Sequence, residues 1–151
     1  SLSCLNSSMF DASFCDGEAI VVLSDIVVSD ARVLNNNLII RGNFTLGSEG
    51  SIVLNKNVTI TVDDCVTLEG QILLNFVSPS PVPLITWKEN CETPSVDSLS
   101  VQSNGCSVET SISGSTLFAL ARITPQGKCI SGTMNISAFT LFCMVLWIIF
   151  V

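Results

Sequence analysis

The acidic pair Asp63-Asp64, followed by Glu69, contains the side chains best suited to catalysis in this chain. Most glycoside hydrolases use two carboxylates, one as the acid and one as the base or nucleophile. Neighbouring residues of a strand point to opposite faces, so the pair need not converge. The chain has no His, and no Lys or Arg lies close to the pair in sequence. We therefore expect a solvated acidic turn in a protein that is not an enzyme, with a carbohydrate-active enzyme kept as an alternative.

Metal and cofactor chemistry has little support in the sequence. Four acidic residues would offer oxygen ligands to Ca²⁺, namely Asp16, Glu18, Asp25 and Asp30, but no EF-hand or calcium-binding repeat organises them. Without His and without a CxxC pair, the seven Cys do not form a zinc motif. Trp87 beside Lys88 is a candidate sugar-stacking spot, although we expect it to pack in the C-terminal cap. We predict no metal site and no cofactor.

The charge balance excludes another class of partner. The formal net charge is −7, and only six residues are Lys or Arg, whereas nucleic-acid phosphates call for many cations. Only 13% of the residues are charged, and Val, Thr and Ile are abundant. This composition favours the surfaces of β-sheets, and 151 residues suffice for one domain with a real core.

Cysteines and glycosylation sequons point to the secretory pathway. The pattern Asn-x-Ser/Thr begins at four positions, Asn6, Asn43, Asn57 and Asn135. Six Cys suit three disulfides in an oxidising compartment: Cys4, Cys15, Cys65, Cys91, Cys106 and Cys129. The opening "SLSC" fits a mature chain whose signal peptide was removed, and a fragment would look the same. We predict a secreted or surface glycoprotein.

The stretch "SEGSIVLNKN" nearly recurs twenty residues later as "LEGQILLNFV". In segments 18–37, 38–57 and 58–77, three columns of apolar residues align: Ile20, Ile40 and Ile60; Ile26, Leu46 and Val66; Leu34, Leu54 and Leu74. An Asn follows each Leu of the last column, giving Asn35, Asn55 and Asn75. Within each segment the apolar residues alternate, which indicates strands.

A short-period strand pattern inside a twenty-residue repeat predicts stacked coils. We expect an all-β fold, a single-stranded right-handed parallel β-solenoid with about 20 residues per coil and an irregular β cap. The three Asn should form a ladder at one corner, where Asn tolerates left-handed backbone and bonds to its neighbour. Gly50 and Gly70 should supply positive φ at another corner. Arg32 makes the first coil imperfect. An antiparallel β-sandwich with evenly spaced strands is the alternative.

After Asn75 the repeat fades into "SPSPVP" and less regular strands. The order "VTLEGQILLNF", "PLITW", "VDSLSVQS" and "CSVETSISGSTLFALARI" resembles the end of extracellular right-handed β-helix proteins, such as autotransporter passengers and similar surface proteins. The resemblance covers roughly residues 38–123. It implies a closing strand and a final hairpin that cap the stack, and it implies little about function.

These patterns divide the chain into an N-terminal cap (1–17), coils (18–77), a C-terminal β cap (78–130) and a tail (131–151). Caps are needed because an open end exposes strand edges that pair with other chains. Closeness in sequence favours the disulfides Cys4–Cys15 and Cys91–Cys106, which leaves Cys65 and Cys129. Six Cys allow fifteen pairings, so the sequence alone does not decide among them.

The tail "AFTLFCMVLWIIFV" is uncharged and contains Cys143. Fourteen helical residues reach about 21 Å, which is less than the roughly 30 Å of a hydrocarbon core. Small residues precede the tail at Ser131-Gly132-Thr133, so we expect a GPI-attachment signal with the lipid anchor at Ser131 or Gly132. The spacer after them is shorter than usual, and a short transmembrane anchor or a buried segment is the alternative.

The sequence thus favours a non-catalytic module at the cell surface, tethered to a membrane by its C-terminal tail. Surface coat, adhesion and recognition are the roles that suit a repetitive face. The partners would be glycans or other surface proteins, with self-association through the ends of the stack, and no nucleic acid. The ectodomain of a single-span receptor or co-receptor is the main alternative.

Overall fold

The computed structural model describes residue 4 and residues 10–121 of the chain. The described part is all-β, with fourteen strands. In chain order they are β1 (Ser13–Asp16), β2 (Ala19–Val22), β3 (Ile26–Val28), β4 (Ala31–Leu34), β5 (Leu38–Ile40), β6 (Phe44–Leu46), β7 (Ser51–Leu54), β8 (Ile60–Val62), β9 (Val66–Leu68), β10 (Gln71–Leu74), β11 (Val82–Thr86), β12 (Ser100–Ser103), β13 (Cys106–Ser113) and β14 (Thr116–Ala121).

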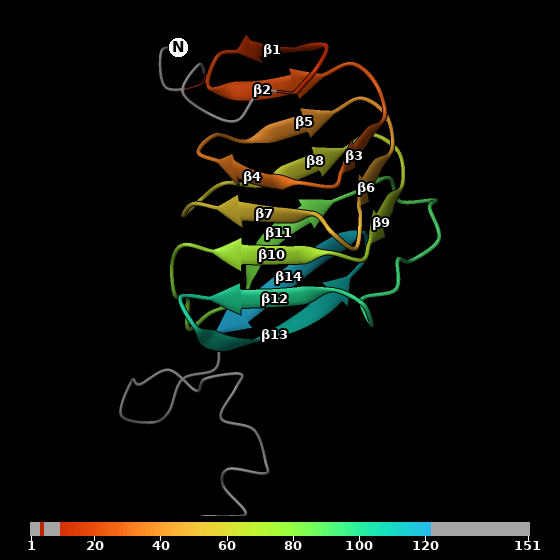
Figure 1. Ribbon diagram of the computed structural model, residues 1–151. Helices are drawn as coiled ribbons and strands as arrows, with labels where there is room; N and C mark the ends of the chain where they lie inside the picture. Colours follow the sequence, from red (N-terminus) through yellow and green to blue (C-terminus); the bar gives the residue numbers. More distant parts are fainter. Residues whose placement is uncertain (1–3, 5–9, 122–151) are drawn as a thin grey trace, which may run out of the picture.

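Strands β2 to β10 pass three times through the same three positions (Figure 1). Each strand pairs in parallel with the strand three places later, as β2 does with β5 and β5 with β8. The same holds for β3, β6 and β9, and for β4, β7 and β10. The parallel pairing continues to β11 beside β8 and to β12 beside β10. An antiparallel sandwich is therefore the wrong architecture for this part of the chain.

Alternate side chains of these strands fill one continuous core between the walls. Leu34, Leu54 and Leu74 are register partners on β4, β7 and β10, and all three are buried. The next residue on either side points outward, which is why β7 and β10 alternate between half-buried and buried positions. Burying one Leu side chain contributes roughly 1.5–3 kcal/mol relative to leaving it exposed. The repeated Leu column therefore stabilises the stacking of one pass on the next.

Two of the three apolar columns expected from the sequence have a different register. Ile20 and Ile60 flank Leu38, whereas Ile40 pairs with Val62. On the next wall Ile26 and Val66 flank Phe44, and Leu46 pairs with Leu68. The expected placement of Ile40 and Leu46 was therefore wrong by two residues, although both side chains still point into the core. The Leu column and the partnership of Ile52 with Ile72 and with Arg32 are confirmed.

Unequal loops explain this difference. The segment between β6 and β7 (47–50) is two residues longer than its counterparts at 29–30 and 69–70. The segment between β7 and β8 (55–59) is likewise longer by two residues than the one at 35–37. The step between paired strands is consequently 20 residues on the β4 wall, but 18 and then 22 on the other walls. Insertions of two residues preserve the alternation between faces and shift only the register.

Gly50 and Gly70 are required for a reason other than positive φ, which neither of them has. A Cβ atom on Gly50 would clash with the backbone carbonyl of Val28, and one on Gly70 would clash with the carbonyls of Gly47 and Gly50. The Glu-Gly pairs therefore mark a corner at which successive passes lie in close backbone contact. The expectation of left-handed glycines at this corner was wrong.

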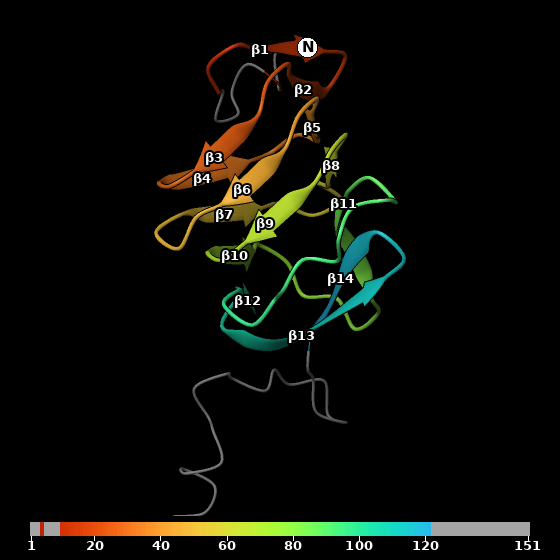
Figure 2. The same cartoon turned by 90° about the vertical axis from the view of Figure 1, so that its right-hand side faces the viewer.

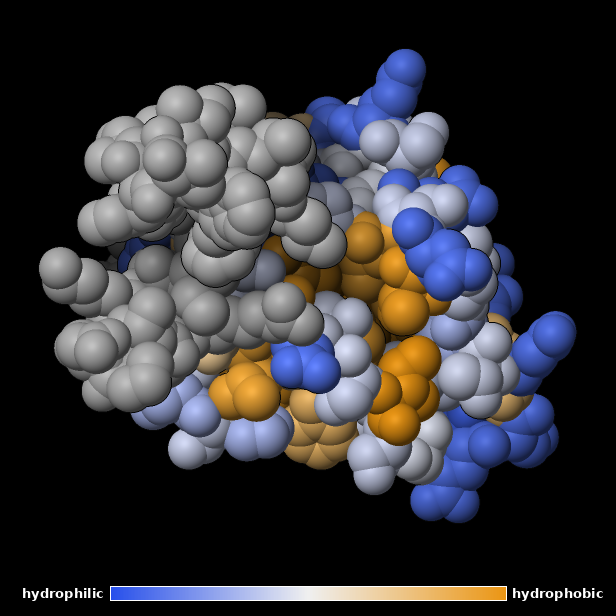
Figure 3. Space-filling model, turned by 90° about the horizontal axis from the view of Figure 1, so that it is seen from below, coloured by the Kyte–Doolittle hydropathy of each residue, from blue (hydrophilic) through white to orange (hydrophobic). Residues whose placement is uncertain are grey.

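Antiparallel strands cover one wall at the N-terminal end of the stack and two walls at the other end (Figure 2). β1 pairs antiparallel with β2 at the N-terminal end. At the other end, β13 and β14 form a hairpin that pairs with β12 on one side and β11 on the other. This hairpin joins two walls into one sheet, while β3, β6 and β9 form a separate sheet. Seen from that end, hydrophobic side chains gather in the middle, with hydrophilic ones toward the right-hand rim (Figure 3).

Candidate functional site

The two carboxylates of Asp63 and Asp64 face different partners. Asp63 Oδ2 lies 3.0 Å from Arg41 Nη1, and Asp64 Oδ1 lies 4.0 Å from Lys88 Nζ. Both carboxylates are partly exposed, at 41% and 46%. Each acid therefore has its own cation.

Sequence reasoning missed both cations because they are distant along the chain. Arg41 precedes Asp63 by 22 residues, which equals the step from β5 to β8. The residue 22 positions before Asp63 occupies the equivalent place in the preceding pass, so a correct pairing of β5 with β8 would have located Arg41 as the partner. Lys88 is separated from Asp64 in sequence by β9, β10 and β11. Its backbone N–H nevertheless donates a hydrogen bond to the Asp64 carbonyl at 3.1 Å.

The four candidate calcium ligands do not assemble. Asp25 Oδ1 accepts a hydrogen bond from the Asn43 backbone N–H at 2.8 Å, and Asp30 pairs with Arg32 at 2.9 Å. Across the described residues, no group of three or more His, Cys, Asp or Glu side chains could hold a metal ion. Asp25 and Asp30 therefore make local structural contacts in this arrangement.

The ladder of Asn35, Asn55 and Asn75 is present. Asn75 Nδ2 donates to Asn55 Oδ1 at 3.0 Å, and Asn55 Nδ2 donates to Asn35 Oδ1. None of the three has a positive φ. The side-chain bonding predicted for these residues is thus confirmed, whereas left-handed backbone contributes nothing to it.

Two of the four sequons lie in the described part of the chain, and both asparagines are exposed. The Oδ1 atom of Asn43 accepts a hydrogen bond from the Cys65 backbone N–H at 3.0 Å. Asn57 has a φ of 70° in the corner between β7 and β8, where Val58 N–H donates to the Asn55 carbonyl at 3.2 Å. Asn6 and Asn135 lie outside the described residues, as do Ser131, Gly132 and the apolar tail.

One disulfide joins cysteines that are close in sequence, and another joins cysteines that are distant in sequence but lie on adjacent layers of the stack. Cys4–Cys15 is confirmed, with the two residues 11 apart. Cys65 bonds to Cys91, 26 residues later, so the expected Cys91–Cys106 pair was wrong. Cys65 lies at the corner between β8 and β9, and Cys91 lies in the connection after β11, which runs along the next layer. Cys106 is also disulfide-bonded, and Cys129 lies outside the described residues.

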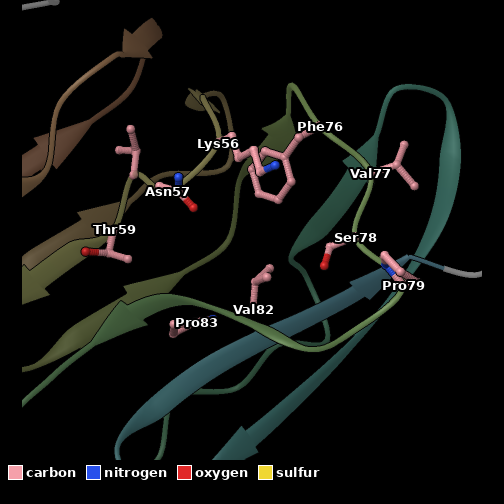
Figure 4. A pocket seen from close by; sticks show the side chains of 10 residues that line it. Lys56, Asn57, Thr59, Phe76, Val77, Ser78, Pro79, Val82 and Pro83 are labelled. Atoms are coloured by element: carbon pink, nitrogen blue, oxygen red, sulfur yellow. The ribbon is translucent and has the colours of Figure 1, made fainter.

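A pocket of about 360 Å³ lies between the corner at 56–59 and the Pro-rich loop 76–83 (Figure 4). Apolar groups from Phe76, Val82 and Pro83 line it together with Lys56 and Asn57. Lys56 is the one ionisable side chain in this lining. Pockets of this size bind small molecules in other proteins. The side chains here suit contact with an apolar or sugar surface, and they include no acid–base pair.

Trp87 is 4% exposed and its side chain belongs to the hydrophobic core of the stack, so it does not form a surface stacking site. The described residues include no helix with the length and hydropathy required for a membrane span.

No protein-family model matches this chain, and neither does any curated protein or solved structure.

Proposed function

We propose that the chain is a non-catalytic surface module built on a right-handed β-solenoid with a mean coil of about 20 residues. Strands that pair in parallel are 18, 22 or 20 residues apart in the sequence, and these separations support a coil of about 20 residues. The right hand is inferred from the strong preference of parallel crossover connections for that hand. On this view β1 and the β13–β14 hairpin serve as the caps.

The observation that carries the proposal is the exposure of Asn43 and Asn57 at the corners of this stack. N-linked glycans attach to the side-chain nitrogen. The hydrogen bond that Asn43 accepts from Cys65 uses the side-chain oxygen, so the bond is compatible with a glycan. Two disulfides are the covalent links expected in an oxidising, extracellular compartment. The apolar segment 138–151 would then tether the module to a membrane, through a GPI anchor or a short span.

The non-catalytic part of the proposal rests on the separated acids. Asp63 and Asp64 each face a different cation, and the pocket at Lys56 has no carboxylate in its lining. A hydrolytic site needs an acid and a base that converge on one bond.

Coat, adhesion and recognition remain the proposed roles, with glycans or other surface proteins as partners. The apolar area at the C-terminal end supports self-association through the ends of the stack (Figure 3). A receptor or co-receptor ectodomain is the second candidate, because it needs the same disulfides and exposed glycans.

Surface display can be tested with an epitope tag placed after Ser1 in the chain, expressed behind a heterologous signal peptide. We expect staining of unpermeabilised cells and a loss of apparent mass on treatment with an N-glycosidase. The variant Asn43→Gln/Asn57→Gln should lose part of that shift, whereas Asn35→Gln, which lies outside any sequon, should keep it. Absence of the protein from the surface with no glycan attached would contradict the proposal.

The anchor and the absence of catalysis are tested separately. Release by a phosphatidylinositol-specific phospholipase indicates a GPI anchor, and retention with an intact tail indicates a span. Wild type and Asp63→Asn/Asp64→Asn should both fail to cleave a panel of glycans. Cleavage by the wild type that the double variant loses would establish an enzyme.

A further inference from the structure

The strand β9 lies at an edge of its sheet, on the side of the stack toward the C-terminal cap. β9 is the last strand of the three-stranded sheet, and β6 is its sole strand partner among the described residues. Cys65 carbonyl accepts from Phe44 N–H at 3.0 Å, and Glu69 N–H donates to the Leu46 carbonyl at 2.9 Å. In a parallel pair, alternate residues direct their backbone groups to opposite sides. The N–H and C=O groups of Val66 and Leu68 therefore point away from β6.

The edge is open because the next pass of the chain does not form a strand there. The neighbouring walls do continue, with β11 beside β8 and β12 beside β10. Residues 87–99 connect β11 to β12 without a strand and run below β9 (Figure 2). The disulfide Cys65–Cys91 holds one end of this connection, and the bond from Ser100 N–H to the Gly70 carbonyl, 3.0 Å long, holds the other.

A groove of about 640 Å³ occupies the place of the missing strand. Val66, Thr67 and Leu68 of β9 form one wall, and loop residues that include Pro94 and Ser95 form the other. The ionisable side chains of the lining are the carboxylates of Glu69 and Glu92, and no cation lines the groove. Both carboxylates belong to exposed residues. The groove thus combines an open strand edge with negative charge.

We propose that this groove binds an extended, positively charged peptide segment of another protein, which adds to β9 as a further strand. Peptides bind open sheet edges by main-chain hydrogen bonds in several other recognition systems. Val66 and Leu68 each offer one donor and one acceptor to such a peptide. The connection 87–99 is held at both ends, so the groove is already formed before a peptide binds. A preformed groove lowers the conformational entropy lost on binding. A second copy of this chain is disfavoured, because its net charge is −7.

The inference is independent of the proposed surface location and can be tested on the purified, disulfide-bonded full chain. The probe is a fluorescent heptapeptide in which threonine and valine alternate between terminal lysines. We expect saturable binding, measured by anisotropy. The same peptide with N-methyl groups on alternate backbone nitrogens should bind far more weakly, because it lacks the donors that pair with a strand edge.

Charge is tested with Glu69→Gln/Glu92→Gln, which should weaken binding at least about threefold at low salt. The matched control is Glu49→Gln/Glu109→Gln, which removes two exposed acids outside the groove and should bind like wild type. If both variants lost the same amount of peptide affinity, the effect would come from the net charge of the protein. That result would overturn the assignment of the binding site to this groove.

Hydrogen exchange measured by NMR locates the peptide. Saturating peptide should slow exchange at the amides of Val66 and Leu68, while the Thr67 amide, directed toward β6, should change little. Binding without this alternation, or equal binding of the N-methylated peptide, would overturn the proposal. Concentration-dependent protection of Val66 and Leu68 without peptide would instead identify a second copy as the occupant.

Discussion

At the scale of single residues, the Asn ladder is the clearest link between sequence and structure. Asn55 bonds to both Asn35 and Asn75, so it is the central member of the ladder. Each side-chain amide satisfies the next, and a net contribution of about 0.5–1.5 kcal/mol per hydrogen bond is typical. The ladder therefore strengthens one corner of the stack without burying apolar surface.

The ladder predicts unequal effects of the same substitution. Asn55→Ala should lower the free energy of unfolding by about 1–2 kcal/mol, because two bonds are lost. Asn75→Ala removes one ladder bond and should cost about half as much. Urea denaturation of both variants measures the difference. Equal losses would mean that the side-chain bonds do not determine the stability of this corner.

At the scale of elements, the corners set how closely successive passes approach. Gly50 and Gly47 belong to the same loop, yet a Cβ on Gly47 would meet the Val28 carbonyl at 3.3 Å, while one on Gly50 would clash with it. We expect Gly50→Ala to destabilise the protein by more than about 2 kcal/mol and Gly47→Ala by less than about 1 kcal/mol. Thermal unfolding distinguishes the two. A harmless Gly50→Ala would contradict the close backbone contact at this corner.

The disulfide Cys65–Cys91 links the corner between β8 and β9 to the connection that follows β11. Closing a segment of this length stabilises a fold by about 3 kcal/mol in the chain-entropy model. Cys65→Ala/Cys91→Ala should therefore remain folded at low temperature and unfold at a lower denaturant concentration. Mass spectrometry of a non-reducing digest should recover Cys65 linked to Cys91. A Cys91–Cys106 peptide in its place would contradict the structure.

The register of residues that recur at a constant spacing could be predicted correctly from the sequence. The Leu column and the Asn ladder recur at twenty residues, because the insertion before β7 is matched by one after it. Ile40 and Leu46 were misplaced because both insertions lie between β6 and β8, so on their two walls the first step between paired strands contains neither insertion and the second step contains both. The pairing of Cys65 with Cys91 and of Asp63 with Arg41 links layers of the stack, and sequence proximity gives no guide to such contacts.

At the scale of the whole molecule, the structure is a stack that β1 closes beside β2 at one end and that the β13–β14 hairpin closes beside β11 and β12 at the other, while β3, β4 and β9 lie at the edges of their sheets. Its core is continuous from Ile20 in the first pass to Leu117 in the final hairpin. The exposed sequon asparagines lie outside that core, and the groove beside β9 borders it at Val66 and Leu68. Binding to other molecules at the surface is the activity that we propose for this arrangement.

The most direct measurement for the account is methyl NOE spectroscopy on the isotope-labelled protein, centred on Leu54. Stacked coils place Leu54 between Leu34 of the preceding pass and Leu74 of the following one. We predict strong methyl contacts from Leu54 to both residues, and contact of Ile60 with Leu38 as its nearest partner on the next wall. Contacts of Leu54 with neither Leu34 nor Leu74 would contradict the parallel stack, and with it the groove beside β9.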